Sequence, residues 1–188
     1  MAEAAELAAR LDALADAFGH HGYDVRSNLL PGATTDELDA LETSLDVTLP
    51  AAYRDLYRWR AGTADEWGTA PRLRFRDEGL LPLSRVREER DSLVEVYGWF
   101  EGVDVRTVVP LATFEGSTLA VACGPQALTP LAEHPVICFF HGIDVYYDSI
   151  ESMVETAIAW VSQPHWAPYV PTPNEDEIWR RHNRSIEF

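Results

Sequence analysis

The spacing of apolar residues changes along this chain, and that change constrains the fold more than any other feature. Up to Gly62 the apolar residues recur every three or four positions, which is typical of helices that bury one face. Beyond Gly62 several short segments alternate between apolar and polar residues or run continuously apolar, as strands do. Helical spacing returns toward the end. The sequence therefore predicts helices, then strands with one helix inserted, then helices.

Local signals mark where the helices begin and end. The first helix is expected over roughly residues 2–18, because its leucines fall on one stripe. Thr34 opens a capping box with the Glu three positions later. Pro50 suits the first position of the following helix, and Gly62 suits its end. Ser84 is the expected N-cap of a helix that runs to about Trp99.

Strand patterns dominate the middle of the chain. Strands are expected over residues 107–113, 118–123 and 136–141, with a hairpin partner over 145–147. An earlier half-buried strand is expected over residues 73–76, where Leu and Phe alternate with Arg. Runs of strands without regular alternation of strand and helix favour a mainly antiparallel sheet. We therefore expect a single α+β domain in which helices pack on a twisted antiparallel sheet.

The two ends of the chain look like additions to that domain. Ser149 caps another helix, after which four prolines predict an extended tail over the surface. Asn174 begins a last short helix. The predicted organisation is an N-terminal helical extension over residues 1–28, an α+β domain over 29–162, and a Pro-rich tail over 163–188 whose terminal helix packs on the domain.

The charge of the chain excludes two classes of partner. The 31 acidic side chains outnumber the 15 basic ones, all of them Arg, and the formal net charge is −16. Such a chain brings no surplus of cations to a phosphate backbone, and an anionic membrane surface repels it. We expect neither nucleic acid nor membrane as a partner. Because a strongly acidic surface attracts cations, a basic protein partner fits the charge better.

An ordered set of motifs resembles the signature of the SUKH superfamily, which groups fungal cell-wall-assembly regulators with many bacterial immunity proteins. The motifs are Leu30-Pro-Gly-Ala-Thr-Thr-Asp-Glu-Leu38, Leu41-Glu42, Leu49-Pro-Ala-Ala-Tyr53-Arg-Asp-Leu-Tyr57-Arg-Trp59, Gly62, Val109-Pro-Leu-Ala112, Thr118–Cys123, His134-Pro-Val136 and Asp148-Ser-Ile-Glu-Ser-Met153. The resemblance extends roughly from Leu29 to Ile158. One departure is the pair Arg60-Ala61 before Gly62, where a His/Asn-type pair is frequent.

The resemblance implies a protein-binding domain that is not an enzyme. The first hypothesis is an immunity-type protein that neutralises a basic toxin, such as a nuclease, by covering its surface with acidic side chains. The second is an intracellular adaptor or regulator of the same fold with another protein partner. The third is a small-molecule binder or enzyme that uses a pocket near Trp67, His141 and Asp144. No cofactor is expected, and the sequence does not indicate an oligomeric state.

Seven residues, most of them from the acid clusters, are the candidate contacts to a protein partner, and the loop at Asp65 joins two acids to an aromatic residue, which is the composition of an interface hot spot. They are Asp65, Glu66, Trp67, Asp77, Glu78, Asp144 and Asp148. The segment from Tyr97 to Phe100 has a similar composition, with a buried helix end as the alternative interpretation.

No arrangement of residues in the sequence predicts catalysis or metal binding. Ser149 and His141, with either Asp148 or Asp144, contain the residue types of a catalytic triad, but a helix cap explains Ser149 better. The six His are scattered, and no Cys pair has metal-ligand spacing.

The first residues carry no secretory signal, so we expect a cytoplasmic protein with reduced thiols. Cys123 and Cys138 lie in apparent strands that could be neighbours, which leaves a disulfide open.

Overall fold

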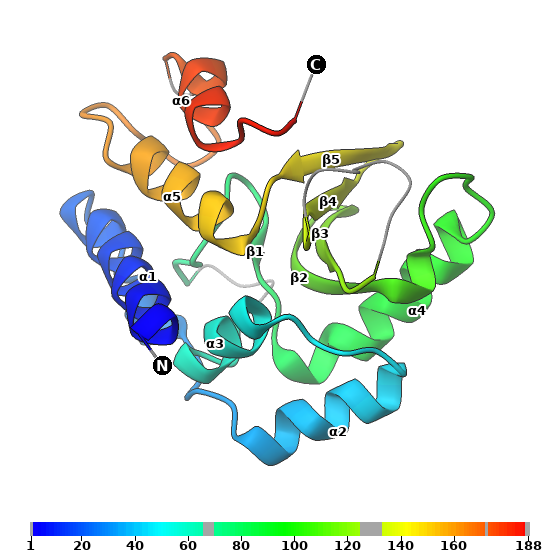
Figure 1. Cartoon of the computed structure of the whole chain (residues 1–188). Coiled ribbons are helices and arrows are strands. Elements are labelled where there is room, and N and C mark those ends of the chain that lie inside the picture. The colour runs from blue at the N-terminus through cyan, green and yellow to red at the C-terminus, as the bar shows by residue number, and fades with distance from the viewer. Residues whose placement is uncertain (1, 66–69, 125–132, 172, 187–188) are drawn as a thin grey trace.

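One antiparallel sheet holds the molecule together, and its spatial order β1-β2-β3-β4-β5 is the order along the chain (Figure 1). The computed structural model describes residues 2–65, 70–124, 133–171 and 173–186. Its strands are β1 Gly79–Leu80, β2 Val108–Phe114, β3 Ser117–Ala122, β4 Val136–Phe139 and β5 Ile143–Tyr147. The single α+β domain with an antiparallel sheet is confirmed. Each of the three long predicted strands and the hairpin partner is present within about two residues of its expected bounds.

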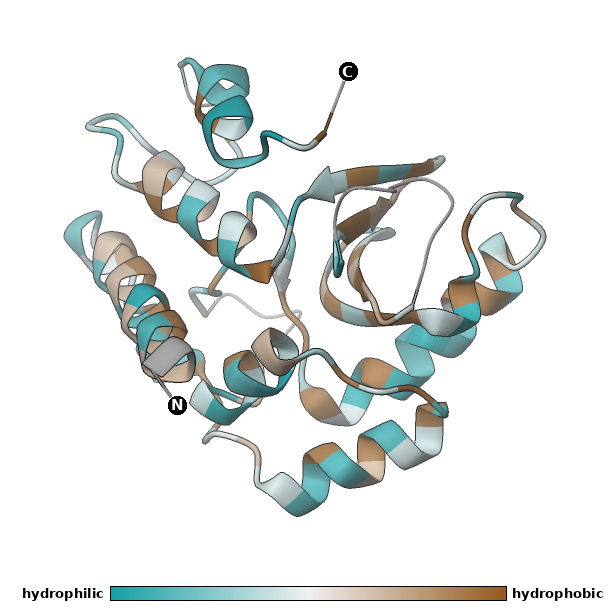
Figure 2. Ribbon diagram, in the orientation of Figure 1, coloured by the Kyte–Doolittle hydropathy of each residue, from teal (hydrophilic) through white to brown (hydrophobic). Residues whose placement is uncertain are grey.

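Six helices surround the sheet in the described part of the chain. They are α1 Ala2–His20, α2 Thr35–Leu45, α3 Ala51–Trp59, α4 Val86–Tyr97, α5 Ile150–Val161 and α6 Glu175–His182. Short 3₁₀ turns occur at Val25–Asn28, Leu83–Arg85 and Val105–Thr107. Along the helices, apolar residues gather toward one side and polar residues toward the other, so that each helix buries one face (Figure 2).

The two faces of the sheet have separate cores because side chains alternate along a strand. On β3, Leu119 and Val121 join the main core, to which α1, α2, α3, α5 and α6 contribute. Ala120 and Ala122 point to the other face and pack in a second core with Leu93 of α4. In Figure 1, α4 lies on the side of the sheet away from α1 and α5. The leucines of α1 belong to the main core, so this helix is integral to the packing.

Two tyrosines of α3 fasten that helix to the sheet. The Tyr53 hydroxyl donates to the Pro110 carbonyl at 2.8 Å, where the β2–β3 register shifts. The Tyr57 hydroxyl donates to the Leu81 carbonyl at 3.0 Å, and both side chains are fully buried. Buried phenols need such partners, so these hydrogen bonds fix the position of α3 over the start of the sheet.

Gly62 ends the α3 segment at a point where only glycine fits. Its φ is +109°, in the region that glycine adopts without strain. A Cβ on this residue would lie 2.4 Å from the Pro82 Cα and 2.5 Å from the Leu81 carbonyl oxygen. The close approach lets the Gly62 and Leu81 segments run past each other beside the sheet.

Two local predictions are wrong. Residues 73–76 form no strand, because Arg74 makes only an isolated bridge to Gly79 and Arg76 has a φ of +90° that turns the chain back. Ser84 is not an N-cap, because it lies inside the 3₁₀ turn Leu83–Arg85, and α4 begins at Val86 without a side-chain cap. The Thr34 capping box is confirmed. So is the Ser149 cap, although its partner is Ser152 rather than an acid.

The cysteines do not pair. Strands β3 and β4 are neighbours, but the register places Cys138 opposite Leu119, four positions from Cys123. Both thiols are free, and burial raises the pKa of Cys123 to about 12 and that of Cys138 to about 11. The disulfide that the sequence left open is therefore excluded by strand register.

Candidate functional site

The candidate acids predicted from the sequence lie on separate elements. Asp65 sits in the loop after α3, where its backbone is anchored by the buried Asn28 side chain. The Asp65 N–H donates to Asn28 Oδ1 at 2.9 Å, and the Asp65 carbonyl accepts from Asn28 Nδ2 at 3.3 Å. The Asp65 side chain is exposed. Glu66 and Trp67 lie outside the described residues.

Asp77 and Glu78 are adjacent in sequence but differ in environment. Asp77 is half-buried, whereas Glu78 is only 6% exposed. Ser117 Oγ donates to Glu78 Oε1 at 2.5 Å, and Glu78 Oε2 has no hydrogen-bond partner among the described residues. Burial raises the pKa of the Glu78 carboxyl. A side chain enclosed in this way cannot reach a protein partner, so Glu78 has no place in a docking surface.

Asp144 and Asp148 also have different roles. Asp144 is exposed on β5, opposite Cys138 of β4. Asp148 holds the C-terminal segment, because its Oδ2 accepts from the Ser185 N–H at 3.1 Å. The Asp148 N–H donates to Oδ1 of the buried Asn183 at 3.1 Å. Asp148 therefore joins the end of β5 to the segment after α6, which is a structural role.

Large apolar side chains are exposed at the end of α4, and another is exposed at the tip of the β4–β5 hairpin. Val96 is 55% exposed, Trp99 is 74% exposed and Phe140 is 51% exposed. We call Val96, Trp99 and Phe100, which contact one another through Trp99, the Trp99 patch. The sequence singled out the segment from Tyr97 to Phe100 but left a buried helix end open. Phe140 at the tip of the β4–β5 hairpin carried no sequence signal of exposure.

The Trp99 patch is ordered by contacts beneath it. Trp99 Nε1 donates to the Val96 carbonyl at 2.7 Å, so the indole N–H needs no external partner. The Trp99 and Phe100 rings lie 4.6 Å apart. Tyr97 packs against Phe100 at 6.0 Å and against Phe139 at 5.3 Å, which links the end of α4 to the strand that precedes the hairpin tip. An exposed Trp held in one orientation loses little side-chain entropy on binding.

Acidic residues flank the patch along the chain. They are exposed and lie on α4 or in the loop after it: Asp91, Glu95, Glu101 and Asp104. An apolar centre with a charged border is the usual arrangement of a protein interface, and Trp and Tyr are enriched among its strongest contacts. The border of this surface is therefore negatively charged.

The described residues show neither a triad nor a metal site. Ser149 Oγ accepts from the Ser152 N–H at 3.2 Å, which makes it a helix cap. His141 is exposed and lies over the Phe140 ring at 4.3 Å. Within the described ranges, no group of three or more His, Cys, Asp or Glu side chains could hold a metal ion. Nor does any helix in those ranges have the length and apolarity to cross a membrane.

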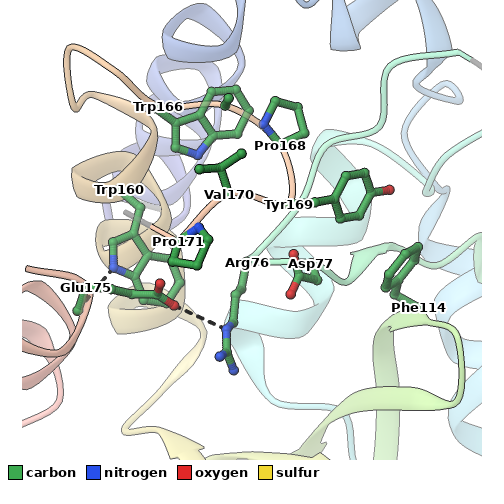
Figure 3. Close-up of a pocket in the computed structure, with 11 residues that line it drawn as sticks. Arg76, Asp77, Phe114, Trp160, Trp166, Pro168, Tyr169, Val170, Pro171 and Glu175 are labelled. Carbon is green, nitrogen blue, oxygen red and sulfur yellow. Dashed lines mark hydrogen bonds and ion pairs between the residues drawn. The ribbon is translucent and has the colours of Figure 1, made fainter. Parts of the chain in front are cut away.

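A separate pocket of about 190 Å³ lies where the tail folds back over the domain (Figure 3). Tail residues Trp166 and Tyr169 face Asp77 and Arg76 across it. Arg76 Nε contacts Glu175 Oε1 at 3.3 Å, so the charges in this pocket are largely balanced within the protein.

Comparison with known protein families matches residues 32–156 to the SMI1/KNR4 family, SUKH-1, over well more than half of the chain. The chain belongs to the SMI1/KNR4 family. Membership is consistent with an immunity or regulatory protein-binding domain. Comparison with curated proteins gives no match. The matched region of this SMI1/KNR4 chain contains α2, α3, α4, the sheet and the Trp99 patch, whereas the Pro-rich tail and α6 lie outside it.

Proposed function

We propose that this SMI1/KNR4 chain is a non-enzymatic immunity-type protein that binds a basic toxin domain and covers its active surface. The observation that carries the proposal is the Trp99 patch, an exposed and ordered aromatic surface bordered by acids on a chain of net charge −16. Family membership supports a protein-binding role of this kind.

The charge accounts for how a partner is attracted. A field of this sign raises the association rate of a basic protein and repels competing polyanions such as nucleic acids. Asp65, Asp77 and Asp144 are proposed to contribute to that field, since their side chains are at least partly exposed. Toxins that bind nucleic acids expose cations, and those cations would be drawn to this surface.

The aromatic patch accounts for how the partner is retained. Long-range charge mainly accelerates encounter, whereas burial of an aromatic anchor in a dry contact slows dissociation. Trp99 is the best anchor in the described part of the chain, because it is the most exposed large apolar residue there. We therefore place the centre of the interface at Trp99, with Val96 and Phe100 beside it and acids at the border.

The proposal is tested by co-expressing the chain in bacterial cells with the toxin domain encoded beside its gene. The wild-type chain is expected to restore growth and to co-purify with the toxin. Trp99→Ala is expected to weaken binding by about tenfold or more, because hot-spot truncations cost about 2 kcal/mol or more. Binding of the purified proteins is measured by calorimetry, and growth is measured in parallel.

Tyr169→Ala is the matched control, since this aromatic residue is 53% exposed and lies in the tail, outside the patch. It should leave toxin binding unchanged. Failure of the wild-type chain to bind or neutralise the neighbouring toxin would contradict the immunity role. Capture of a non-toxin partner through Trp99 would favour the regulatory alternative and keep the interface.

A further inference from the structure

The tail and the loop before β1 enclose a second pocket, and two arginines are among the residues that line it. Its volume is about 370 Å³, and the tail contributes Trp166, Pro168 and Tyr169 to its wall. The other lining residues are Phe18, Tyr23, Ala70, Pro71, Arg72 and Arg74. Two arginines and four aromatic rings therefore meet in one cavity, and its described lining contains no acid.

The tail is held in place by aromatic contacts that shape this pocket. Trp166 packs edge-on against Phe18 at 5.1 Å and against Tyr23 at 5.6 Å. Tyr169 lies beneath the guanidinium of Arg74, 4.1 Å from ring centroid to Cζ. Figure 3 shows Trp166, Pro168 and Tyr169 along the tail, and these three residues line both this cavity and the neighbouring pocket.

Three arginines at alternate positions, Arg72, Arg74 and Arg76, lie between the two pockets. The guanidinium of each lies over an aromatic ring. Arg76 stacks on Tyr146 and pairs with Glu175, so its charge is satisfied. Arg72 donates to the Tyr169 hydroxyl at 3.2 Å. The intervening Leu73 and Phe75 are fully buried, which forces the three cations to the outer side. The alternation of Arg with Leu and Phe, which predicted a strand, therefore places three arginines on one side of a segment that is not a strand.

Arg74 lines this pocket with one guanidinium nitrogen left without an acceptor among the described residues. Its Nη1 is out of contact with solvent and has no hydrogen-bond partner in the described residues. Burial also lowers the pKa of this guanidinium. Many other arginines do contact carboxylates: Arg10, Arg26, Arg54, Arg58, Arg76, Arg85 and Arg181. A guanidinium nitrogen buried without an acceptor is unfavourable, and a ligand oxyanion that reaches Arg74 Nη1 would relieve that penalty.

We propose that this pocket binds a small molecule in which a carboxylate or phosphate is attached to a flat apolar ring. The oxyanion would accept from Arg74 Nη1 and from Arg72, since guanidinium groups match both anions with paired hydrogen bonds. The ring would lie against Trp166 and Tyr23. A cavity of this size with aromatic walls and a few polar groups is typical of small-molecule sites. The proposal does not depend on the proposed toxin partner.

Calorimetry with three probes of one shape tests the proposal: naphthoate, naphthyl phosphate and the neutral naphthalenemethanol, each at low salt with the full chain. At least one of the two anions should bind, and naphthalenemethanol should bind at least about tenfold more weakly than that anion. The tighter of the two anions identifies the chemical group for which the site is built. Absence of binding by both anions, or equal binding of the neutral probe, would overturn the proposal.

Two arginine variants locate the site. Arg74→Gln should raise the dissociation constant of the better anion by about tenfold or more. Arg87→Gln removes the same charge from an exposed position on α4 and should leave it unchanged. If circular dichroism shows that Arg74→Gln is unfolded, Arg74→Lys replaces it, and binding should weaken several-fold because the planar fork is lost. Equal affinity in the Arg74 and Arg87 variants would refute the assignment.

Discussion

At the scale of single residues, Glu78 carries the clearest stability prediction. Its carboxylate is buried with one oxygen satisfied by Ser117 and the other without a partner. Glu78→Gln keeps an acceptor for Ser117 and removes a buried charge. We expect the variant to be more stable than the wild type at pH 7 by about 1 kcal/mol or more.

The pH dependence of that difference follows from the direction of the pKa shift. Burial raises the Glu78 pKa above its ordinary value of 4.5, so the folded state holds the proton more tightly than the unfolded chain. The stability from this proton is fully present below 4.5 and is lost as pH rises through the folded pKa. Thermal unfolding should show wild type and Glu78→Gln converging at low pH and diverging toward pH 7. The exposed Glu101→Gln should show no such divergence.

The burial of individual residues was the feature that the sequence predicted least well. Glu78 was expected to contact a partner together with Asp77, but the chain turns at Arg76 and directs Glu78 toward Ser117 on β3. Phe140 looked like the continuation of an apolar strand, yet β4 ends at Phe139 and leaves it at an exposed hairpin tip. In both cases burial depends on backbone turns that no local pattern reveals.

At the scale of elements, the attachment of α3 to β2 can be tested with one hydroxyl. Tyr53→Phe removes the donor to the Pro110 carbonyl and leaves that carbonyl buried at a register shift. The free energy of unfolding should fall by about 1–3 kcal/mol. Tyr97→Phe, at a half-exposed ring, should change it by less than about 0.5 kcal/mol. Denaturant unfolding measures both, and equal effects would show that the Tyr53 hydrogen bond contributes nothing.

Elements with two independent local signals were predicted well. Thr34 combined a capping box with an apolar stripe, and α2 begins at the next residue. The segment from Leu73 to Arg76 offered alternation alone, and a tail more than 90 residues away in sequence decided its conformation: Arg74 stacks on Tyr169 and Arg76 pairs with Glu175. The anion pocket was invisible in the sequence for the same reason, because its walls come from α1, the loop before β1 and the tail.

At the scale of the whole molecule, charge and aromatic patch should act on different rate constants of partner binding. The net charge of −16 acts over a Debye length, which shrinks from about 30 Å at 0.01 M to about 8 Å at 0.15 M ionic strength. The association rate constant with a basic toxin domain should therefore fall about tenfold or more across that range. The dissociation rate constant should change little, because contacts in a dry interface are screened less.

The variant at the patch should show the opposite behaviour. Trp99→Ala leaves the net charge unchanged, so association should keep its rate and its salt dependence, while dissociation accelerates by about tenfold or more. Stopped-flow mixing gives the first constant and surface plasmon resonance the second. If Trp99→Ala slows association and salt alters dissociation instead, the net charge and the Trp99 patch do not act on separate rate constants. The acidic side chains would then have to lie inside the contact itself rather than around it.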